Sequence, residues 1–394
     1  MIRAGITVDL TTVRRNVQRL GALAAPARYA AVVKANAYGH GLVPVALALE
    51  AQVEAFGVYR VDEAASLRDA GIVKPILVFG PVEPGELDLA VRSGAALTLW
   101  SEGAFVRDAA RAARRRNTRL AAHAKIDTGV TRLGLDRDRA AEAIAAYLAD
   151  ADLDLRGVFT HLAAAEELES SYTLAQLERF ESALLPLQGA LAARKVIRHA
   201  AASAAAMLFP RSRLDLIRAG IATYGIWPSE ETRAAAGASL VLEPALEWST
   251  ELCVVRSVEA GRSVGYGCTF HTARPSQIGV LPIGYAEGLP RALSNTGFAL
   301  VHGRRVPFVG RICMNMAFVD VTGVPQAAPG SRVTLIGRDG DERIDASELA
   351  EAAGTIGYEL VTRLPAEIPR RYLGVADEPA VISAIAAAKS SVPS

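Results

Sequence analysis

The sequence has little of what marks several classes of protein. It holds three cysteines, Cys253, Cys268 and Cys313, and no pair with CxxC spacing. An odd number of cysteines without that spacing favours a reduced compartment and argues against a structural zinc site. Net charge is +1, from 43 Lys and Arg against 42 Asp and Glu. The chain therefore lacks the basic excess that nucleic-acid binding normally requires, and no nucleic-acid partner is predicted.

Long apolar runs are also missing. No stretch reaches the roughly 18 residues needed to cross a bilayer, and Asp9, Arg14 and Arg15 interrupt the N-terminus where the apolar core of a signal peptide would lie. We therefore predict a cytoplasmic protein with no membrane contact. Five arginines between Arg111 and Arg119 form the one basic cluster. Because they lie in an Ala-rich helical stretch, we interpret them as a solvated helix face.

The composition is that of a globular chain with room for two domains, at 51% hydrophobic and 22% charged residues over 394 positions. Short apolar runs in the first 225 residues alternate with stretches of helical period. The eight runs are Tyr29–Val33, Phe56–Tyr59, Pro75–Phe79, Ala95–Leu99, Leu120–Ile126, Leu155–Thr160, Val196–His199 and Leu214–Ile217. This rhythm predicts an α/β fold, a closed (β/α)8 TIM-like barrel. An open dinucleotide-binding sheet is disfavoured because no GxGxxG follows the first run.

A change of pattern after the barrel indicates a second domain. We interpret residues Trp227–Ser239 as a linker. From Leu240 to Tyr372 the runs become short, strand-like and punctuated by glycine. We predict a barrel over residues 1–236, a mainly-β C-terminal domain over 237–376, and a C-terminal helix and tail over 377–394.

Polar residues follow several predicted barrel strands. Lys34 ends the first, Lys125 lies at the end of the fifth, His161 follows the sixth, Ser203 follows the seventh and Arg218 ends the eighth. Active sites of such barrels lie at the carboxyl ends of the strands, so these residues are candidates for one site. No metal site is predicted.

Lys34 and the last two strand ends together suggest a cofactor. A lysine in an apolar barrel mouth loses part of its hydration, which frees the amine to form a Schiff base with an aldehyde. The loops after strands seven and eight are the usual phosphate site of the fold. They carry Ser203 and the backbone N–H groups of Gly220 and Ile221. An aldehyde with a phosphate is pyridoxal 5'-phosphate, the predicted cofactor.

A series of motifs then gives a more specific indication. They are Val33–Gly41 (VKANAYGHG), Lys125–Gly129 (KIDTG) with Arg132–Gly134 (RLG), Thr160–His161, Arg218–Ile221 (RAGI) with Tyr224–Gly225, Val264–Gly267 (VGYG), Leu281–Tyr285 (LPIGY), Gly310–Met314 (GRICM) and Gly354–Glu359 (GTIGYE). In content and order, over Thr7 to Tyr372, the chain resembles the alanine racemase family. Each motif alone is weak, and the whole series is specific.

The resemblance implies a pyridoxal-phosphate-dependent isomerase that interconverts L- and D-alanine and supplies D-alanine for peptidoglycan. Its two catalytic residues would be Lys34, which bonds the cofactor, and Tyr266, contributed by the partner subunit of a homodimer. They would move the α-proton on opposite faces of the substrate, as inversion at one carbon requires.

Other roles also follow from the resemblance. Arg218 would face the pyridine nitrogen, and His161 would link Arg218 to the catalytic tyrosine. Arg132 would bind the substrate carboxylate, and Lys125 matches a lysine that carries a carbamate. The resemblance assigns phosphate contacts to Tyr38, Ser203, Gly220, Ile221 and Tyr358, a place beneath the ring to His199, and the substrate entrance to Met314 and Tyr285.

Departures from the family pattern leave the preferred substrate open. Asn315, Glu287, Glu166 and Glu367 stand where other residues are usual, and Ala202 replaces an asparagine before Ser203. A racemase of serine or another amino acid is therefore an alternative, as is a related barrel decarboxylase.

Two further alternatives are disfavoured. A lone barrel that only binds the cofactor would lack the domain bearing Tyr266. Residues Gly261–Gly265 fit the GxSxG nucleophile elbow of serine hydrolases, but no helix is predicted after them, as that motif requires.

Overall fold

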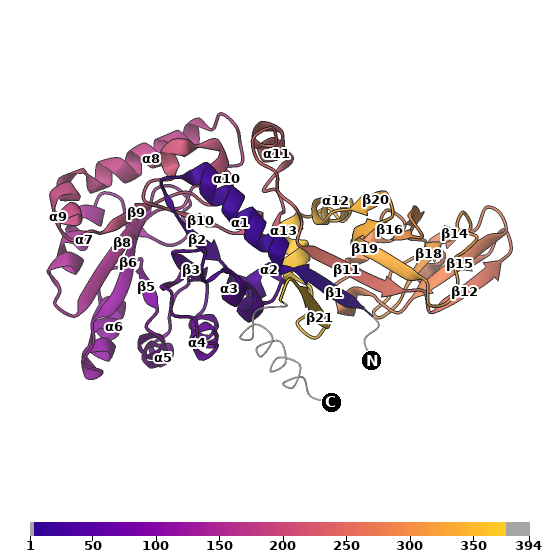
Figure 1. Ribbon diagram of the computed structural model, residues 1–394, viewed down its shortest axis with the longest axis horizontal. Helices are drawn as coiled ribbons and strands as arrows, with labels where there is room; N and C mark the ends of the chain where they lie inside the picture. Colours follow the sequence, from indigo (N-terminus) through magenta and orange to yellow (C-terminus); the bar gives the residue numbers. More distant parts are fainter. Residues whose placement is uncertain (1–3, 376–394) are drawn as a thin grey trace.

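The structure, a computed structural model, describes residues 4–375. The helix and tail predicted for 377–394 lie outside the described residues. A barrel of strands wrapped by helices occupies one end of the molecule, and a strand-rich region occupies the other (Figure 1). No helix within residues 4–375 is long and apolar enough to cross a bilayer.

Eight parallel strands form the barrel, in the order β10-β2-β3-β4-β5-β6-β8-β9. They are β2 (Arg28–Val32), β3 (Ala55–Val58), β4 (Ile76–Val78), β5 (Ala96–Leu99), β6 (Leu120–Asp127), β8 (Leu153–Phe159), β9 (Ile197–His199) and β10 (Leu216–Ala219), with the short β7 (Leu135–Asp136) beside β6. Backbone hydrogen bonds from Asp215 to Arg198 (3.0 Å) and from Arg218 to Ala201 (2.9 Å) nearly close the ring. Every predicted barrel strand is confirmed to within two residues.

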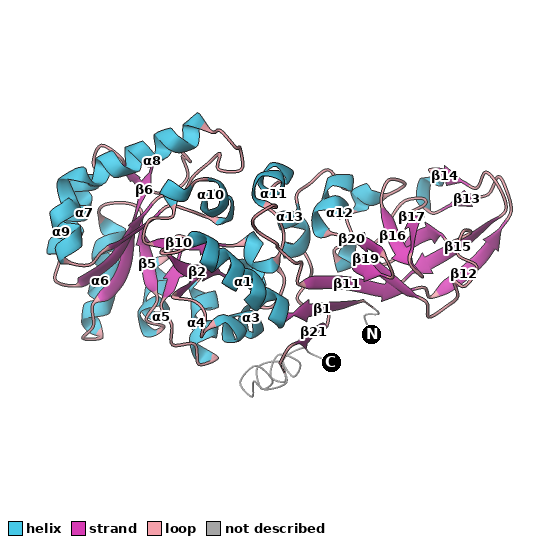
Figure 2. Ribbon diagram, turned by 45° about the horizontal axis from the view of Figure 1, so that its top comes forward, coloured by secondary structure: helices cyan, strands magenta, loops and turns pink. Residues whose placement is uncertain are grey.

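Helices cover the outside of the barrel (Figure 2). They are α1 (Leu10–Ala24), α3 (Leu42–Leu49), α4 (Val61–Asp69), α5 (Leu87–Arg92), α6 (Ala104–Arg115), α7 (Ala140–Ala149), α8 (Ser171–Leu184), α9 (Gln188–Ala193) and α10 (Ser203–Leu208). The arginine cluster lies on and after α6, exposed and partly paired, for example Arg111 with Asp108 at 3.2 Å.

The second region is mainly β, as predicted. Its strands are β11 (Leu246–Glu251), β12 (Val254–Val258), β13 (Ser263–Val264), β14 (Phe270–His271), β15 (Ser276–Leu281), β16 (Phe298–Val301), β17 (Arg304–Pro307), β18 (Ala317–Asp320), β19 (Arg332–Asp339), β20 (Glu342–Ile344) and β21 (Arg370–Leu373). Two short helices, α12 (Ala346–Ala352) and α13 (Gly357–Thr362), complete it. The GxSxG residues fall on the β13–β14 hairpin, which is not a strand-to-helix elbow.

Two features of the fold were not predicted. A first strand, β1 (Gly5–Asp9), pairs with β11 and β21, so the N-terminus joins the sheet of the second region. The stretch read as a linker contains a helix, α11 (Glu230–Ala236), whose first turn is capped by Ser229. The two regions are therefore tied together at both ends of the barrel sequence.

The backbone directly after β2 is unusual. The short element α2 (Lys34–Tyr38) includes three residues, Ala35 to Ala37, with φ between 53° and 54°, and Tyr38 continues the run at 52°. Left-handed backbone costs an L-residue roughly 1–2 kcal/mol, so the surroundings must hold this turn. His40 Nδ1 donates to the carbonyls of Ala37 (3.1 Å) and Tyr38 (2.9 Å). The turn sets the positions of Lys34 and Tyr38.

Gly39, at the end of this turn, offers a test of how tightly it is packed. A Cβ there would lie 2.0 Å from the carbonyl oxygen of Val361 in α13, whereas a Cβ at Gly71 meets nothing within 4 Å. The φ angles are similar, +81° and +90°. We expect Gly71→Ala to lower the free energy of unfolding by about 1–2 kcal/mol through backbone strain. Gly39→Ala should cost about 1–3 kcal/mol more, through overpacking.

Urea unfolding of the two variants beside the unsubstituted protein measures both costs. Equal losses would mean that α13 moves away from the turn freely and does not hold it.

Candidate active site

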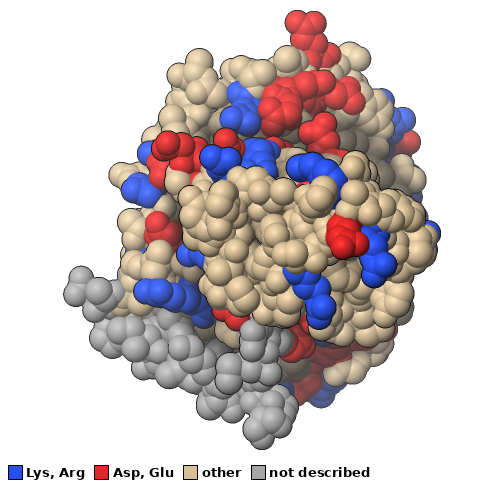
Figure 3. Space-filling view, turned by 90° about the vertical axis from the view of Figure 1, so that its right-hand side faces the viewer, with Lys and Arg blue, Asp and Glu red and all other residues tan. Residues whose placement is uncertain are grey.

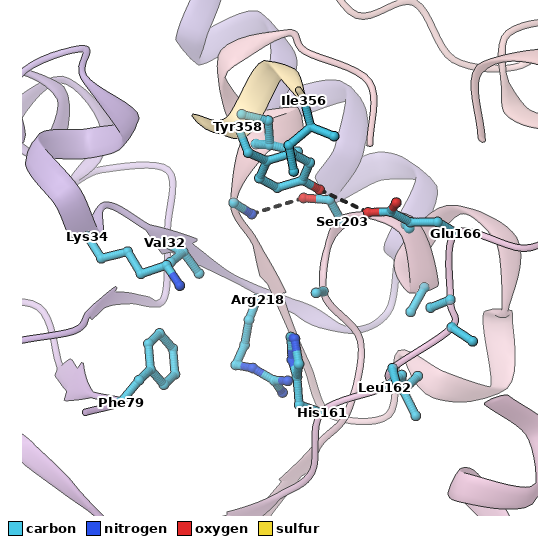
Figure 4. A pocket seen from close by; sticks show the side chains of 18 of the residues that line it. Val32, Lys34, Phe79, His161, Leu162, Glu166, Ser203, Arg218, Ile356 and Tyr358 are labelled. Carbon is cyan, nitrogen blue, oxygen red and sulfur yellow. Dashed lines mark hydrogen bonds between the residues drawn. The ribbon is translucent and has the colours of Figure 1, made fainter. Parts of the chain in front are cut away.

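A cavity of about 1430 Å³ opens at the carboxyl ends of the barrel strands. Its wall includes ten of the predicted site residues, which are Lys34, Tyr38, Lys125, Arg132, His161, Ser203, Arg218, Gly220, Ile221 and Tyr358. Figure 4 shows Lys34, His161 and Arg218 directed into it from different walls. Tyr358 comes from α13, so the second region closes one side. Residues 4–375 contain no cluster of side chains suited to a metal.

Two lysines in the cavity have a lowered pKa. Burial lowers the pKa of Lys34, and the nearby charge of Arg132 lowers it further. Burial, together with Arg132 and Arg218, lowers the pKa of Lys125 to about 8. A lowered pKa leaves more of each amine neutral near pH 7 to 8, and a neutral amine is the nucleophilic form.

Arg218 is buried at the base of the cavity, and its two terminal nitrogens make three hydrogen bonds. One nitrogen donates to His199 Nδ1 at 2.8 Å, and the other to the carbonyls of Thr160 (2.8 Å) and Ala200 (2.9 Å). His199 Nε2 in turn lies 2.8 Å from Nδ1 of His123 on β6. The resemblance links Arg218 to His161, but Arg218 bonds His199 instead. His123 was missed, although it lies two positions before Lys125 on the same face of its strand.

Small and hydroxyl-bearing residues form a cradle on the opposite wall. Ser203 Oγ accepts from the Gly220 N–H at 3.0 Å. A Cβ at Gly220 would lie 2.4 Å from Tyr38 Oη, so only glycine leaves this corner open. Tyr358 Oη donates to Glu166 Oε1 at 3.3 Å, a contact drawn in Figure 4. The hydroxyls of Tyr38, Tyr358 and Ser203, together with backbone N–H groups, form a cradle suited to a phosphate.

The loop after β6 is built to hold Arg132. The Asp127 carboxylate accepts from four successive backbone N–H groups, those of Gly129 (2.8 Å), Val130 (3.0 Å), Thr131 (3.2 Å) and Arg132 (3.2 Å). This turn explains the KIDTG motif, because a carboxylate at the first bend fixes the backbone that carries the arginine. Arg132 thereby stays at the cavity wall, where a fixed planar donor suits a carboxylate ligand.

Four predicted residues do not line the cavity. His199 is fully buried and bonded to Arg218, and the other three lie elsewhere. Tyr266, Tyr285 and Met314 do not line the cavity of their own chain, and 73%, 44% and 57% of their respective surfaces are exposed. All three belong to the second region, where Tyr266 and Tyr285 begin 3-10 turns and the Met314 carbonyl accepts from the Ala286 N–H at 2.9 Å. Asn315, next to Met314, donates to Glu287 at 2.8 Å, so two of the departures from the family pattern form one pair.

The fold and the cavity define a barrel enzyme whose site gathers amines, a buried arginine and an oxyanion cradle at one mouth. Residues 8–228 match the family "Alanine racemase, N-terminal domain", and residues 245–372 match "Alanine racemase, C-terminal domain". The chain belongs to the alanine racemase family, a family of isomerases.

Relatives and solved structures agree. An alanine racemase from Symbiobacterium thermophilum is 43% identical over 93% of this chain and 96% of its own length. The crystal structure of alanine racemase from D-cycloserine-producing Streptomyces lavendulae superposes with a TM-score of 0.88, at 34% identity over 95% of this chain and 98% of that one. That of the Bartonella henselae enzyme with covalently bound pyridoxal phosphate gives 0.82, at 28% identity over 95% and 100%.

The buried histidines predict how stability depends on pH. Burial lowers the pKa of His123 and His161 to about 3 and that of His40 to about 4, whereas an unfolded histidine titrates near 6.5. The folded state therefore binds fewer protons than the unfolded state, and stability falls as the pH drops below about 6.5. Between about pH 6.5 and 5 each such histidine should cost on the order of 2 kcal/mol.

Urea unfolding at pH 7 and pH 5 measures this loss. His161→Gln should lessen the difference between the two pH values, while His271→Gln, at an exposed position, should leave it unchanged. If His161→Gln leaves the difference intact, the half-buried His161 does not stay neutral in the folded protein at pH 5.

Proposed function

We propose that this protein is an alanine racemase that interconverts L- and D-alanine with pyridoxal 5'-phosphate. The observation that carries the proposal is the convergence of ten predicted residues from both regions on one cavity. Alanine is the named substrate of the curated relatives, and pyridoxal phosphate is bound in the Bartonella henselae structure.

The residues present fit this cofactor. The corner that a Cβ at Gly220 would fill lies beside Ser203 and Tyr38 and leaves room for a phosphate. Lys34, with its lowered pKa, supplies the amine to which an aldehyde bonds. Ser203, Tyr38 and Tyr358 would hold the phosphate, together with the N–H groups of Gly220 and Ile221. When bound, pyridoxal phosphate withdraws electrons from the α-carbon of an attached amino acid and so acidifies its α-proton.

Arg218 limits what else the site can do. Its guanidinium only donates hydrogen bonds and keeps its charge. Facing the pyridine nitrogen, it would leave that nitrogen without a proton and restrain electron withdrawal by the ring. We propose that this restraint favours proton transfer over decarboxylation. Arg132 would orient the substrate carboxylate on the other side.

Two groups must handle the α-proton, one on each face. Lys34 holds the proton on one face after it is freed, and Tyr266 holds it on the other. Because Tyr266 is 73% exposed and does not line the cavity of its own chain, a second copy would supply it. The end of the second region carries few charged side chains at its centre, which suits burial against another subunit (Figure 3). We propose a homodimer with shared sites.

The domain division and cellular role complete the proposal. We assign residues up to 236 to the barrel, except β1, and residues 237–376 to the C-terminal domain. The enzyme would act in the cytoplasm and supply D-alanine for peptidoglycan.

A substitution at Tyr266 tests its role as a base. Tyr266→Phe removes the hydroxyl that holds the proton, so racemisation of L-alanine, followed by circular dichroism, should slow at least about 100-fold. The absorption of the bound cofactor should persist, because Lys34 is intact. Tyr147→Phe, which removes a hydroxyl that donates to the Ser101 carbonyl outside the cavity, should keep full activity. Racemisation at an undiminished rate in Tyr266→Phe would exclude this residue as a base.

A mixing experiment tests whether the site is shared. Lys34→Ala and Tyr266→Phe should each be inactive alone. In mixed dimers one site would combine an intact Lys34 with an intact Tyr266 from the partner, so activity should return on mixing and subunit exchange. If the mixture forms mixed dimers and stays inactive, Tyr266 does not act across the subunits.

Carbamylation of Lys125 can be tested directly. With a pKa lowered to about 8, its neutral amine should add carbon dioxide, forming an N–C bond and releasing one proton. The resulting anion would offset the charge of Arg132. A carbamate signal should appear in the carbon NMR spectrum of protein equilibrated with 13C-bicarbonate, vanish in Lys125→Gln and persist in Lys195→Gln. A signal that survives in Lys125→Gln would place any carbamate elsewhere.

A further inference from the structure

Glu63 lies outside the cavity wall, and its carboxylate reaches the backbone directly after Lys34. It belongs to the first turn of α4, and its Oε1 atom accepts from the N–H of Ala35 at 2.6 Å. Ala35 is the first of the four left-handed residues that follow β2. The contact spans 28 positions of the sequence, so it ties the start of this turn to the neighbouring βα unit.

Helix capping explains only half of this arrangement. The other oxygen, Oε2, accepts from the N–H groups of Tyr59 (2.9 Å) and Arg60 (3.1 Å), where β3 ends and α4 begins. A glutamate at the third position of a helix commonly accepts from the backbone at the helix start in this way. Such a cap uses one oxygen. The bond from the second oxygen to Ala35 is therefore a further role of Glu63.

The bond to Ala35 matters because the turn is costly to form. Left-handed backbone is unfavourable for residues other than glycine, and it persists only where the surroundings hold it. His40 holds the far end of the turn through two backbone carbonyls. At the near end Ala35 is exposed, and its N–H donates to the half-buried Glu63. A hydrogen bond to a carboxylate is stronger than one between neutral groups, so Glu63 fixes the backbone next to Lys34.

Glu63 also acts on the charge of the Lys34 amine. Burial and the charge of Arg132 lower the pKa of Lys34, whereas the charge of Glu63 raises it. Lys125 and His161 also face Lys34, which lowers the pKa of both. Glu63 is thus a carboxylate that opposes a set of basic groups. Because its position is fixed by three backbone N–H groups, its effect on the amine is fixed as well.

We propose that Glu63 is a positioning residue for Lys34. Its carboxylate anchors the backbone on which the left-handed turn begins, and it supplies a negative charge that acts on the lysine amine. Since Glu63 does not line the cavity, it acts through Lys34 and touches no ligand itself. The proposal rests on the proposed bond between Lys34 and pyridoxal phosphate, but the anchoring of the backbone can be tested without the cofactor.

The amide group of Ala35 can be observed alone by NMR. Lys34–Ala35 is the only Lys–Ala pair in the sequence, so full-length protein with 13C in lysine carbonyls and 15N in alanine gives a single carbonyl-to-amide correlation. We expect a downfield amide proton that exchanges slowly with water. Glu63→Gln keeps the shape but offers one accepting oxygen to three N–H groups. Exchange of this proton should become roughly tenfold faster, because a bond to a charged group is lost.

Glu86→Gln is the matched control. Glu86 is also half-buried and accepts from the N–H of Glu83 at 2.9 Å as a helix cap, but it lies outside the cavity wall. This variant should leave the Ala35 amide unchanged. An amide signal that is the same in Glu63→Gln and in the unsubstituted protein would overturn the proposal.

The cofactor-loaded protein tests the effect of the charge. The absorption of the bound cofactor changes when the nitrogen of Lys34 loses its proton. Without the negative charge of Glu63 the protonated form is less stable, so the pH of this change should fall by roughly one unit in Glu63→Gln. It should not move in Glu86→Gln. Glu63→Asp keeps the charge on a shorter side chain, so it should preserve the pH of the change while the Ala35 amide exchanges faster.

The two measurements separate this proposal from the proposed function. An altered Ala35 amide together with an unchanged pH of the absorption change would show that Glu63 does not act on Lys34, and would overturn the proposal. Failure of the unsubstituted protein to bind pyridoxal phosphate would instead contradict the proposed function. The Ala35 amide would then decide by itself whether Glu63 anchors the turn.

Discussion

Lys34, Lys125, Arg132 and Arg218 meet in one cavity, where burial and the repulsion between positive charges limit how many of these groups keep a proton, and the site depends on this constraint. Desolvation and this repulsion together explain why both lysines have a lowered pKa. The same field makes the cavity receptive to anions. A phosphorylated cofactor, a substrate carboxylate and a carbamate would each offset part of the charge. The proposed chemistry thus depends on the combined charge of the residues that line the cavity as much as on any single side chain.

The second region also helps to form this site, because it contacts the turn that follows Lys34. The left-handed turn after Lys34 packs against α13 at Gly39, and Arg370 donates to the Gly39 carbonyl at 2.8 Å. The ring of His40 stacks on Tyr224 at 4.4 Å. Several independent contacts therefore hold four strained residues in place. Backbone strain of this kind persists only where the surroundings over-determine it, and here it positions the lysine that the mechanism needs.

Much of the fold and of the cavity was predictable, for reasons visible in particular residues. The barrel strands are buried apolar runs of regular spacing, and parallel strands bring their carboxyl ends to one rim. Lys34, Lys125 and Arg218 could therefore be placed together from their positions at strand ends. The strand β1 was missed although Gly5–Asp9 alternates apolar and other residues, because its partners β11 and β21 lie far from it in the chain. The helix α11 was missed because short polar helices resemble linkers.

The sequence by itself determined the barrel, the mainly-β second region, the family and the residue types of the site, because strand periodicity and motif order are local properties of the chain. Tertiary structure alone decided two things. It directed Arg218 to His199 rather than to His161, and it placed Tyr266 outside the cavity of its own chain. Each depends on distances between side chains from different elements, and those distances are set by packing in three dimensions.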